Sequence, residues 1–218
     1  MNQSISIQNS SAEFVSNQLS APNLTVVNQF KKGKFIYQEG ALAKKFYCLK
    51  KGLLLMGTQS ENGKSSFSHL VFEGEYFGEE VLLGFHSRNS FALVLSNEAA
   101  VEECPEGLIK VDVNELLRSV FVQKMERFQQ TLMRNSTLAL KQRIQSVLKE
   151  IALGFGVRLL NGDVLIRTHL KHRELALLSN ATRQSVTTCL LELVREGKVL
   201  IDKDSLLVNH QLMAVDFN

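Results

Sequence analysis

The C-terminal third of the chain contains the run KHRELALLSNATRQSVTTCLLELVRE, residues 171–196. Residues 171–178 have the composition of a short helix, and residues 179–181, Ser-Asn-Ala, have that of a tight turn. Thr182 is a good N-cap for a second helix that extends to about residue 196. Two helices joined by so short a turn predict a helix-turn-helix.

Two β-hairpins are predicted on either side of these helices. Residues 157–167 contain two short apolar runs around Asn161-Gly162, a dipeptide typical of tight hairpin turns. Residues 198–201 and 206–208 form a second pair of runs around a polar turn that includes Lys203. This order of elements within so few residues indicates a winged helix-turn-helix.

The predicted second helix separates an apolar stripe from a polar N-terminal end. The stripe comprises Val186, Cys189, Leu190, Leu193 and Val194. The polar end comprises Thr182, Arg183, Gln184, Thr187 and Thr188. Arg can bond bidentately to guanine and Gln to adenine, Thr can touch a thymine methyl or a phosphate, and a capped N-terminus suits a phosphate oxygen. We therefore expect these five polar residues, with Lys203 of the wing, to contact DNA, although a solvated helix face has the same composition.

Charge and hydropathy narrow the class of protein further. Residues 138–218 hold eleven Lys and Arg against eight Asp and Glu, which equals the net charge of +3 of the whole chain, so residues 1–137 are neutral. Excess positive charge in the C-terminal third fits contact with phosphate. The N-terminus resembles no export signal, and no apolar run approaches the roughly 18 residues of a membrane span. We expect a cytoplasmic protein without membrane contact.

The middle of the chain has a different residue pattern. Short apolar runs over residues 23–111 are separated by glycines at nearly every turn, which predicts an all-β roll or barrel.

Residues 112–115 have the spacing of a capping box that opens a helix. Within that helix Phe121, Met125, Phe128 and Leu132 follow a heptad rhythm, which predicts packing on a partner helix. An amphipathic helix packed on its own domain is the alternative. A further apolar helix is predicted from Leu140 to Leu153, ending at Gly154-Phe155-Gly156.

Cysteine and histidine spacing does not suggest metal or redox chemistry. Cys48, Cys104 and Cys189 are far apart, and we expect three buried thiols. His169 and His172 lie three residues apart, but a tetrahedral metal site needs more ligands, so we expect no metal there. The chain has no nucleophile elbow, phosphate loop or metal-ligand spacing, and we do not expect an enzyme.

With these elements in this order, the chain resembles the Crp/Fnr family of bacterial transcription regulators over nearly its whole length. Residues 30–40, FKKGKFIYQEG, resemble the first strands of the family's β-roll, and residues 47–52 the strand and glycine turn that follow. Residues 74–79, GEYFGE, resemble its effector-site signature, and residues 173–187 its helix-turn-helix. The resemblance implies that Arg183, Gln184 and Thr188 read bases, that the dimer interface lies within residues 112–137, and that RNA polymerase is a further partner. Some members carry an iron–sulfur cluster on N-terminal cysteines, but the first 47 residues here contain none.

The effector site departs from the pattern of family members that bind cyclic AMP. In those proteins a Gly-Glu pair meets the ribose and an Arg-Ser pair the phosphate, while polar residues of the dimer helix meet the base. Gly78-Glu79 is present, but counting without a gap puts Asn89-Ser90 at the phosphate pair, and a one-residue deletion would restore Arg88. Phe128 and Gln129 fall near the base contacts. A buried phosphate without a guanidinium loses a strong charge-assisted contact. We therefore expect cyclic nucleotide to bind weakly or not at all.

These observations lead to one hypothesis and one alternative. We expect an α+β protein with a β-roll over residues 1–112, a dimerisation helix over residues 113–137 and a winged helix-turn-helix over residues 138–218. We expect it to act as a homodimeric, sequence-specific DNA-binding transcription regulator whose roll senses a small molecule or has lost that ability. The alternative is a nucleotide-sensing regulatory module whose C-terminal helices contact protein.

Overall fold

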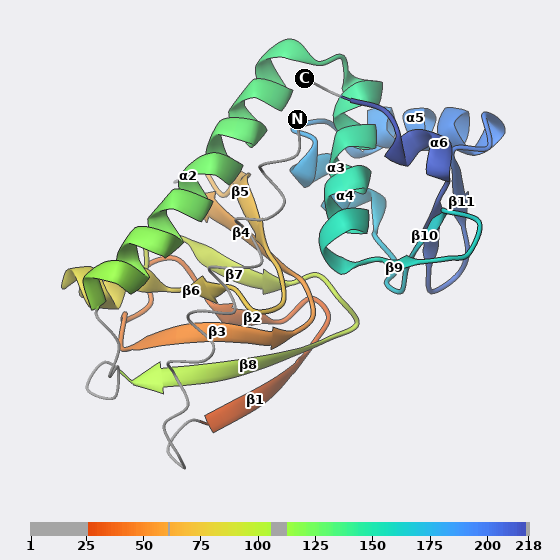
Figure 1. Ribbon diagram of the computed structural model, residues 1–218. Coiled ribbons are helices and arrows are strands. Elements are labelled where there is room, and N and C mark those ends of the chain that lie inside the picture. The colour runs from red at the N-terminus through yellow and green to blue at the C-terminus, as the bar shows by residue number, and fades with distance from the viewer. Residues whose placement is uncertain (1–25, 61, 106–112, 217–218) are drawn as a thin grey trace.

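The N-terminal half of the described chain is a β-roll. The computed structural model describes residues 26–60, 62–105 and 113–216. Two four-stranded antiparallel sheets, with strand orders β1-β8-β3-β6 and β2-β7-β4-β5, enclose one apolar core (Figure 1). The elements are β1 (Val26–Lys31), β2 (Phe35–Tyr37), β3 (Lys45–Lys51), β4 (Leu54–Gln59), β5 (Ser65–Val71), β6 (Tyr76–Phe77), the 3₁₀ turn η1 (Glu79–Leu83), β7 (Phe91–Val94) and β8 (Glu98–Pro105).

Seven glycines of this half lie at its turns, as the sequence predicts, whereas Gly57 lies within β4. The seven with positive φ are Gly33, Gly40, Gly52, Gly63, Gly74, Gly78 and Gly84. At Gly52, between β3 and β4, a Cβ atom would also lie 2.7 Å from the carbonyl oxygen of Glu98. A side chain is excluded there both by backbone conformation and by space. The prediction of an all-β unit is confirmed.

Two helices connect the roll to the C-terminal part. α2 (Val113–Thr137) lies along the roll, and the chain then turns back into α3 (Leu140–Phe155) (Figure 1). The capping box expected at residues 112–115 begins outside the described residues. The helix end expected at residues 154–156 is confirmed, because Phe155 is the last helical residue and Gly156 is the C-cap. A Cβ atom on Gly154, in the last turn of α3, would lie 2.4 Å from the ring of Phe72, so this glycine permits close packing of α3 on the roll.

The C-terminal part contains the predicted helix-turn-helix and both hairpins. Its sheet has the order β11-β12-β10-β9. The sequence did not predict α6, whose N-cap Asn209 accepts a hydrogen bond from the backbone N–H of Gln211 at 2.8 Å. The elements are β9 (Val157–Arg158), β10 (Val164–Ile166), α4 (His172–Leu178), α5 (Arg183–Arg195), β11 (Val199–Ile201), β12 (Leu206–Val208) and α6 (His210–Met213).

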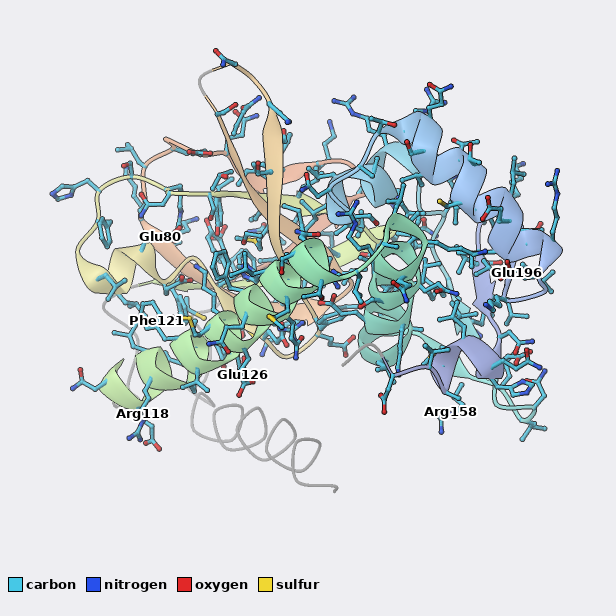
Figure 2. All side chains as sticks on the ribbon, turned by 90° about the horizontal axis from the view of Figure 1, so that it is seen from above. Glu80, Arg118, Phe121, Glu126, Arg158 and Glu196 are labelled. Carbon is cyan, nitrogen blue, oxygen red and sulfur yellow. The ribbon has the colours of Figure 1, made fainter. Side chains whose placement is uncertain are left out.

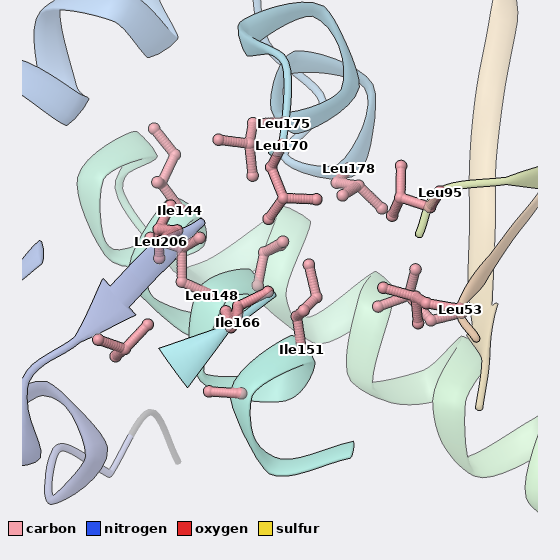
Figure 3. Packing of buried hydrophobic residues seen from close by; sticks show 14 of the residues in the cluster. Leu53, Leu95, Ile144, Leu148, Ile151, Ile166, Leu170, Leu175, Leu178 and Leu206 are labelled. Carbon is pink, nitrogen blue, oxygen red and sulfur yellow. The ribbon is translucent and has the colours of Figure 1, made fainter. Parts of the chain in front are cut away.

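One apolar core joins the roll to the C-terminal part. Leu53 and Leu95 of the roll lie beside Leu178 of α4 and Ile151 of α3, and all four are fully buried (Figure 3). Burying a Leu or Ile side chain stabilises a fold by about 1.5–3 kcal/mol. The contact between the two parts is therefore a substantial source of stability. No helix in the described ranges is both long and apolar enough to cross a membrane.

Candidate functional site

The polar end of α5 is held in place by the turn that precedes it. Asn180 adopts the left-handed conformation at φ 47°, which Asn tolerates better than other residues with a side chain. Thr182 caps α5, because its hydroxyl accepts a hydrogen bond from the N–H of Ser185 at 3.2 Å. The predicted turn and N-cap are both confirmed. The buried face of α5, formed by Val186, Leu190 and Leu193, fixes its rotation.

The residues that we expect to contact DNA lie together at this end of α5. Thr182, Arg183, Gln184 and Thr188 are exposed. Thr187 is half-buried, and its hydroxyl lies 2.8 Å from Nδ1 of His172, the first residue of α4. This contact links the N-terminal ends of the two helices. The sequence pattern therefore brings five polar groups to one surface, and their roles remain predictions.

A basic cleft adjoins the same surface. It has a volume of about 430 Å³ and is lined by His169, Lys171, His172, Arg173 and Arg183. Three of these side chains are those of lysine or arginine, and no carboxylate of the described residues lines the cleft. Such a lining attracts an anion such as a backbone phosphate. Of this group, only Arg183 is among the residues that the sequence predicts for DNA contact, although the charge pattern also contains a cluster of basic residues at 167–173.

The wing lies beyond α5. Lys203 is exposed in the turn between β11 and β12, where the backbone N–H of Asp202 bonds to the carbonyl of Ser205 at 3.0 Å. A lysine in such a turn presents a point charge on a flexible stem, which suits phosphate better than a base edge. The predicted role of Lys203 is compatible with this position.

Arg88 is the buried cation of the roll. Its side chain is 1% exposed, and Nη1 donates to the carbonyl oxygen of Gly78 at 2.8 Å and to Glu80 at 3.0 Å. Nη2 donates to the carbonyl oxygen of Lys45, and the guanidinium carbon lies 4.3 Å from the ring centroid of Tyr37. A Cβ atom on Gly78, which has φ +81°, would lie 2.8 Å from Nη1 of Arg88. Glycine at position 78 thus allows the guanidinium to approach the backbone.

The other expected effector residues divide into two groups. Ser90 lies beside the Arg88 pair, with its hydroxyl 3.5 Å from Glu80, whereas Asn89 is exposed. Phe128 and Gln129 are exposed on a face of α2 that does not line the cavity between α2 and the roll. Within one chain, the structure therefore brings Gly78, Arg88 and Ser90 together and leaves Asn89, Phe128 and Gln129 apart from them.

Glu79 belongs to a polar layer between the roll and α2. Its carboxylate pairs with Lys124 of α2, and Glu75 pairs with Arg127 one turn further along. His69 lies in the same layer, where burial, followed by the charges of Lys124 and Arg127, lowers its pKa to about 3. It is therefore neutral at pH 7. The remaining cavity measures about 20 Å³, which is room for roughly one water molecule.

The heptad residues of α2 form an apolar stripe on its exposed face. Phe121, Met125, Phe128 and Leu132 are 41%, 58%, 52% and 58% exposed. In Figure 2 the side chains of Arg118 and Glu126 extend from α2 on the side away from Glu80 and the roll. The stripe is not covered by the chain's own described residues. Four large apolar side chains in a row on one helix are typical of a helix that packs on a partner.

Comparison with known proteins agrees with this architecture. Residues 27–101 match the family model of the cyclic nucleotide-binding domain. The transcriptional regulator SdrP of Thermus thermophilus is 30% identical over 175 residues, which cover 78% of this chain and 83% of that protein. The CRP-like cAMP-activated global transcriptional regulator of Mycobacterium tuberculosis is 23% identical over 186 residues, which cover 83% and 82% of the two chains.

Solved structures show the same fold. A CRP/FNR-family transcriptional regulator from Thermus thermophilus superposes with a TM-score of 0.71 at 25% identity, covering 87% of this chain and 99% of that one. A second CRP-family regulator from the same organism has a TM-score of 0.73 at 24% identity, covering 85% and 94%. The resemblance noted in the sequence is confirmed. By its sequence relatives and its α+β fold, the chain belongs to the CRP/FNR family of transcriptional regulators.

Proposed function

We propose that this chain is a sequence-specific DNA-binding regulator that reads its operator with the N-terminal end of α5. The observation that carries the proposal is the exposed polar end of α5 beside a cleft lined by five basic or imidazole side chains. Cations beside a helix N-terminus bind backbone phosphate, while side chains on the first turns can reach base edges. The alternative, a protein partner for these helices, gives no reason for the basic cleft.

The apolar stripe of α2 supports action as a homodimer. Two copies of α2 packed through Phe121, Met125, Phe128 and Leu132 would bury side chains that are otherwise in water. A symmetric dimer presents two copies of α5 about one DNA turn, roughly 34 Å, apart and favours a two-fold-related operator. As a cytoplasmic transcription regulator of this kind, it would have RNA polymerase as a further partner.

The test separates base reading from phosphate binding. We would select a binding site from random duplexes and titrate three variants against that site and a scrambled duplex at two salt concentrations. Arg183→Ala should cost about 1–3 kcal/mol on the selected site and flatten the preference at one base pair, because a bidentate base contact is lost. Lys203→Ala should weaken both duplexes alike and lower the salt slope by about one.

Arg118→Ala is the matched control, because it removes the same charged group from an exposed position on α2. It should leave both affinities unchanged. Equal weakening of both duplexes by Arg183→Ala would place its contact on the backbone and leave base reading to Gln184, Thr187 or Thr188. If neither Arg183→Ala nor Lys203→Ala changes DNA affinity, α5 is not the reader and the protein-contact alternative is the better account.

A further inference from the structure

The roll holds a single arginine, and that arginine is already neutralised by the chain itself. Arg88 is the only arginine in the first 117 residues. Its guanidinium is 1% exposed, and the carboxylate of Glu80 that pairs with it is 7% exposed. A charge so deeply buried is very costly unless a counter-ion accompanies it. Glu80 is that counter-ion.

The remaining contacts of Arg88 leave little for a ligand. Nη1 is shared between Gly78 and Glu80, Nη2 is bound by the carbonyl of Lys45, and the rings of Tyr37 and Tyr47 lie over the guanidinium at 4.3 and 5.4 Å. Among the described residues, Nε of Arg88 has no hydrogen-bond partner. Buried polar atoms in folded proteins are usually paired, so this nitrogen is the part of the guanidinium with capacity left for a further contact.

A cyclic nucleotide would meet two obstacles here. Its phosphate carries a negative charge that needs a buried cation, but the approach to Arg88 is occupied by Glu80, and two like charges in one buried site repel strongly. Its ribose and base would need space, but Glu79 is bound to Lys124 and the cavity between the roll and α2 holds only about 20 Å³. The cation that such a ligand requires is already paired with a carboxylate, and the space that it requires is filled by side chains.

We propose that Glu80 is a built-in anion that occupies the place of an effector. The roll is then held in one arrangement without cyclic nucleotide. It contains a latent anion site, which removal of Glu80 opens. The step from the roll to DNA binding rests on the proposed function. The latent site itself is a property of the roll and can be tested without DNA. Small carboxylates and phosphate are the ligand class it would take, because Arg88 binds either through charge-assisted hydrogen bonds.

The experiment is a chemical rescue on the full-length chain. Glu80→Ala removes the carboxylate and leaves a void beside Arg88, whereas Glu80→Gln removes the charge but keeps the volume. Thermal unfolding is followed in chloride, acetate and phosphate at matched ionic strength. We expect both variants to melt below the parent. Acetate or phosphate should raise the midpoint of Glu80→Ala by several degrees more than that of the parent or of Glu80→Gln.

A second pair of variants shows whether Arg88 holds the rescuing anion. In Glu80→Ala/Arg88→Met the anion-specific gain should disappear, while Glu80→Leu/Arg88→Met, which replaces the buried pair by apolar side chains, provides a folded reference without either charge. An equal anion effect in the parent and in Glu80→Ala would overturn the proposal. So would an anion effect that persists after Arg88 is removed.

Calorimetry with cyclic AMP completes the test on the parent chain. We expect no binding tighter than about 1 mM, and DNA affinity that is the same with and without cyclic AMP. Micromolar binding to the parent would overturn the proposal, because the Glu80 pair would then yield to a ligand. If the parent binds no duplex at all, the proposed function fails, whereas the rescue of Glu80→Ala by acetate would still establish Glu80 as the anion of the roll.

Discussion

Arg127 is a side chain of α2 whose removal should measurably lower stability. Its guanidinium pairs with Glu75 of the roll, lies 3.8 Å from Glu150 of α3 and sits 4.7 Å from the ring centroid of Phe72. One residue thus binds the roll and the C-terminal part together. Arg127→Met keeps the apolar stem and removes the charge.

The cost falls mainly on Glu75. Glu150 keeps Arg134 at 2.8 Å after the substitution, whereas Glu75 keeps the N–H of Phe72 at 2.9 Å. Removing one partner of a buried pair costs about 3–5 kcal/mol. Because the side chains of Arg127 and Glu75 are still 16% and 18% exposed, solvent screens part of this effect, and we expect a loss of about 2–3 kcal/mol in the free energy of unfolding at pH 7.

The loss should depend on pH with a defined sign. Burial raises the pKa of Glu75, and the charge of Arg127 opposes that rise, so the pKa should rise further in Arg127→Met. A carboxyl whose pKa is higher in the folded than in the unfolded state favours unfolding once it ionises. This destabilisation begins as the pH rises above the unfolded pKa, near 4.5, and is complete above the folded pKa. Each further unit of rise costs about 1.4 kcal/mol. The variant should therefore lose more stability at pH 8 than at pH 5.

Urea unfolding at both pH values measures this loss. Adding Glu75→Gln to Arg127→Met should remove the extra pH dependence and recover part of the stability, with a coupling of about 0.5–3 kcal/mol between the two sites. Arg118→Met, an exposed arginine on the same helix, should change stability by less than about 0.5 kcal/mol. An equal loss at pH 5 and pH 8 would show that Arg127 acts through packing alone and that Glu75 is not held ionised by it.

Two further substitutions test other contacts of the helices. Replacing both Phe128 and Leu132 with Glu should give monomers in sedimentation, because charges would be buried at the interface between two copies of α2. A double variant that remains dimeric would place the interface elsewhere. Gly154→Ala should destabilise the protein by about 1–3 kcal/mol in thermal or urea unfolding, because the added Cβ would lie 2.4 Å from the ring of Phe72. This cost should outweigh the higher helix propensity of Ala. A stabilised variant would contradict the close packing of α3 on the roll.

The features that the sequence predicts well are those decided by neighbouring residues. Thr182 caps α5 through a bond to a residue three positions later, and the Asn161-Gly162 turn closes a hairpin within a few residues. The buried stripe of α5 also follows from spacing alone. Local rules are sufficient at these positions because the groups they involve are only a few residues apart in the sequence.

The features that the sequence did not resolve depend on distant residues. Counting without a gap from Gly78 selects Asn89-Ser90, but the chain path between η1 and β7 leaves Asn89 exposed and buries Arg88 against Gly78. Sequence spacing also did not reveal that Glu80 would pair with Arg88, because the pairing depends on how that loop folds. The sequence likewise places Gly154 at the end of α3, but it does not show that the missing side chain leaves room for the ring of Phe72.

Lys32 shows why a division of the chain at residue 138 does not separate two independent units. Its ammonium group, on the turn after β1, donates to the carbonyl oxygens of Leu95 and His169 at 2.6 Å each and lies 3.2 Å from Glu174. Glu174 also accepts the N–H of Lys171 at 2.8 Å and so closes the first turn of α4. The carboxylate that starts the helix-turn-helix therefore also holds a lysine of the roll. Because α5 packs on α4 in a core to which Leu53 and Leu95 also contribute, the direction in which α5 faces depends on the roll as well as on the C-terminal part.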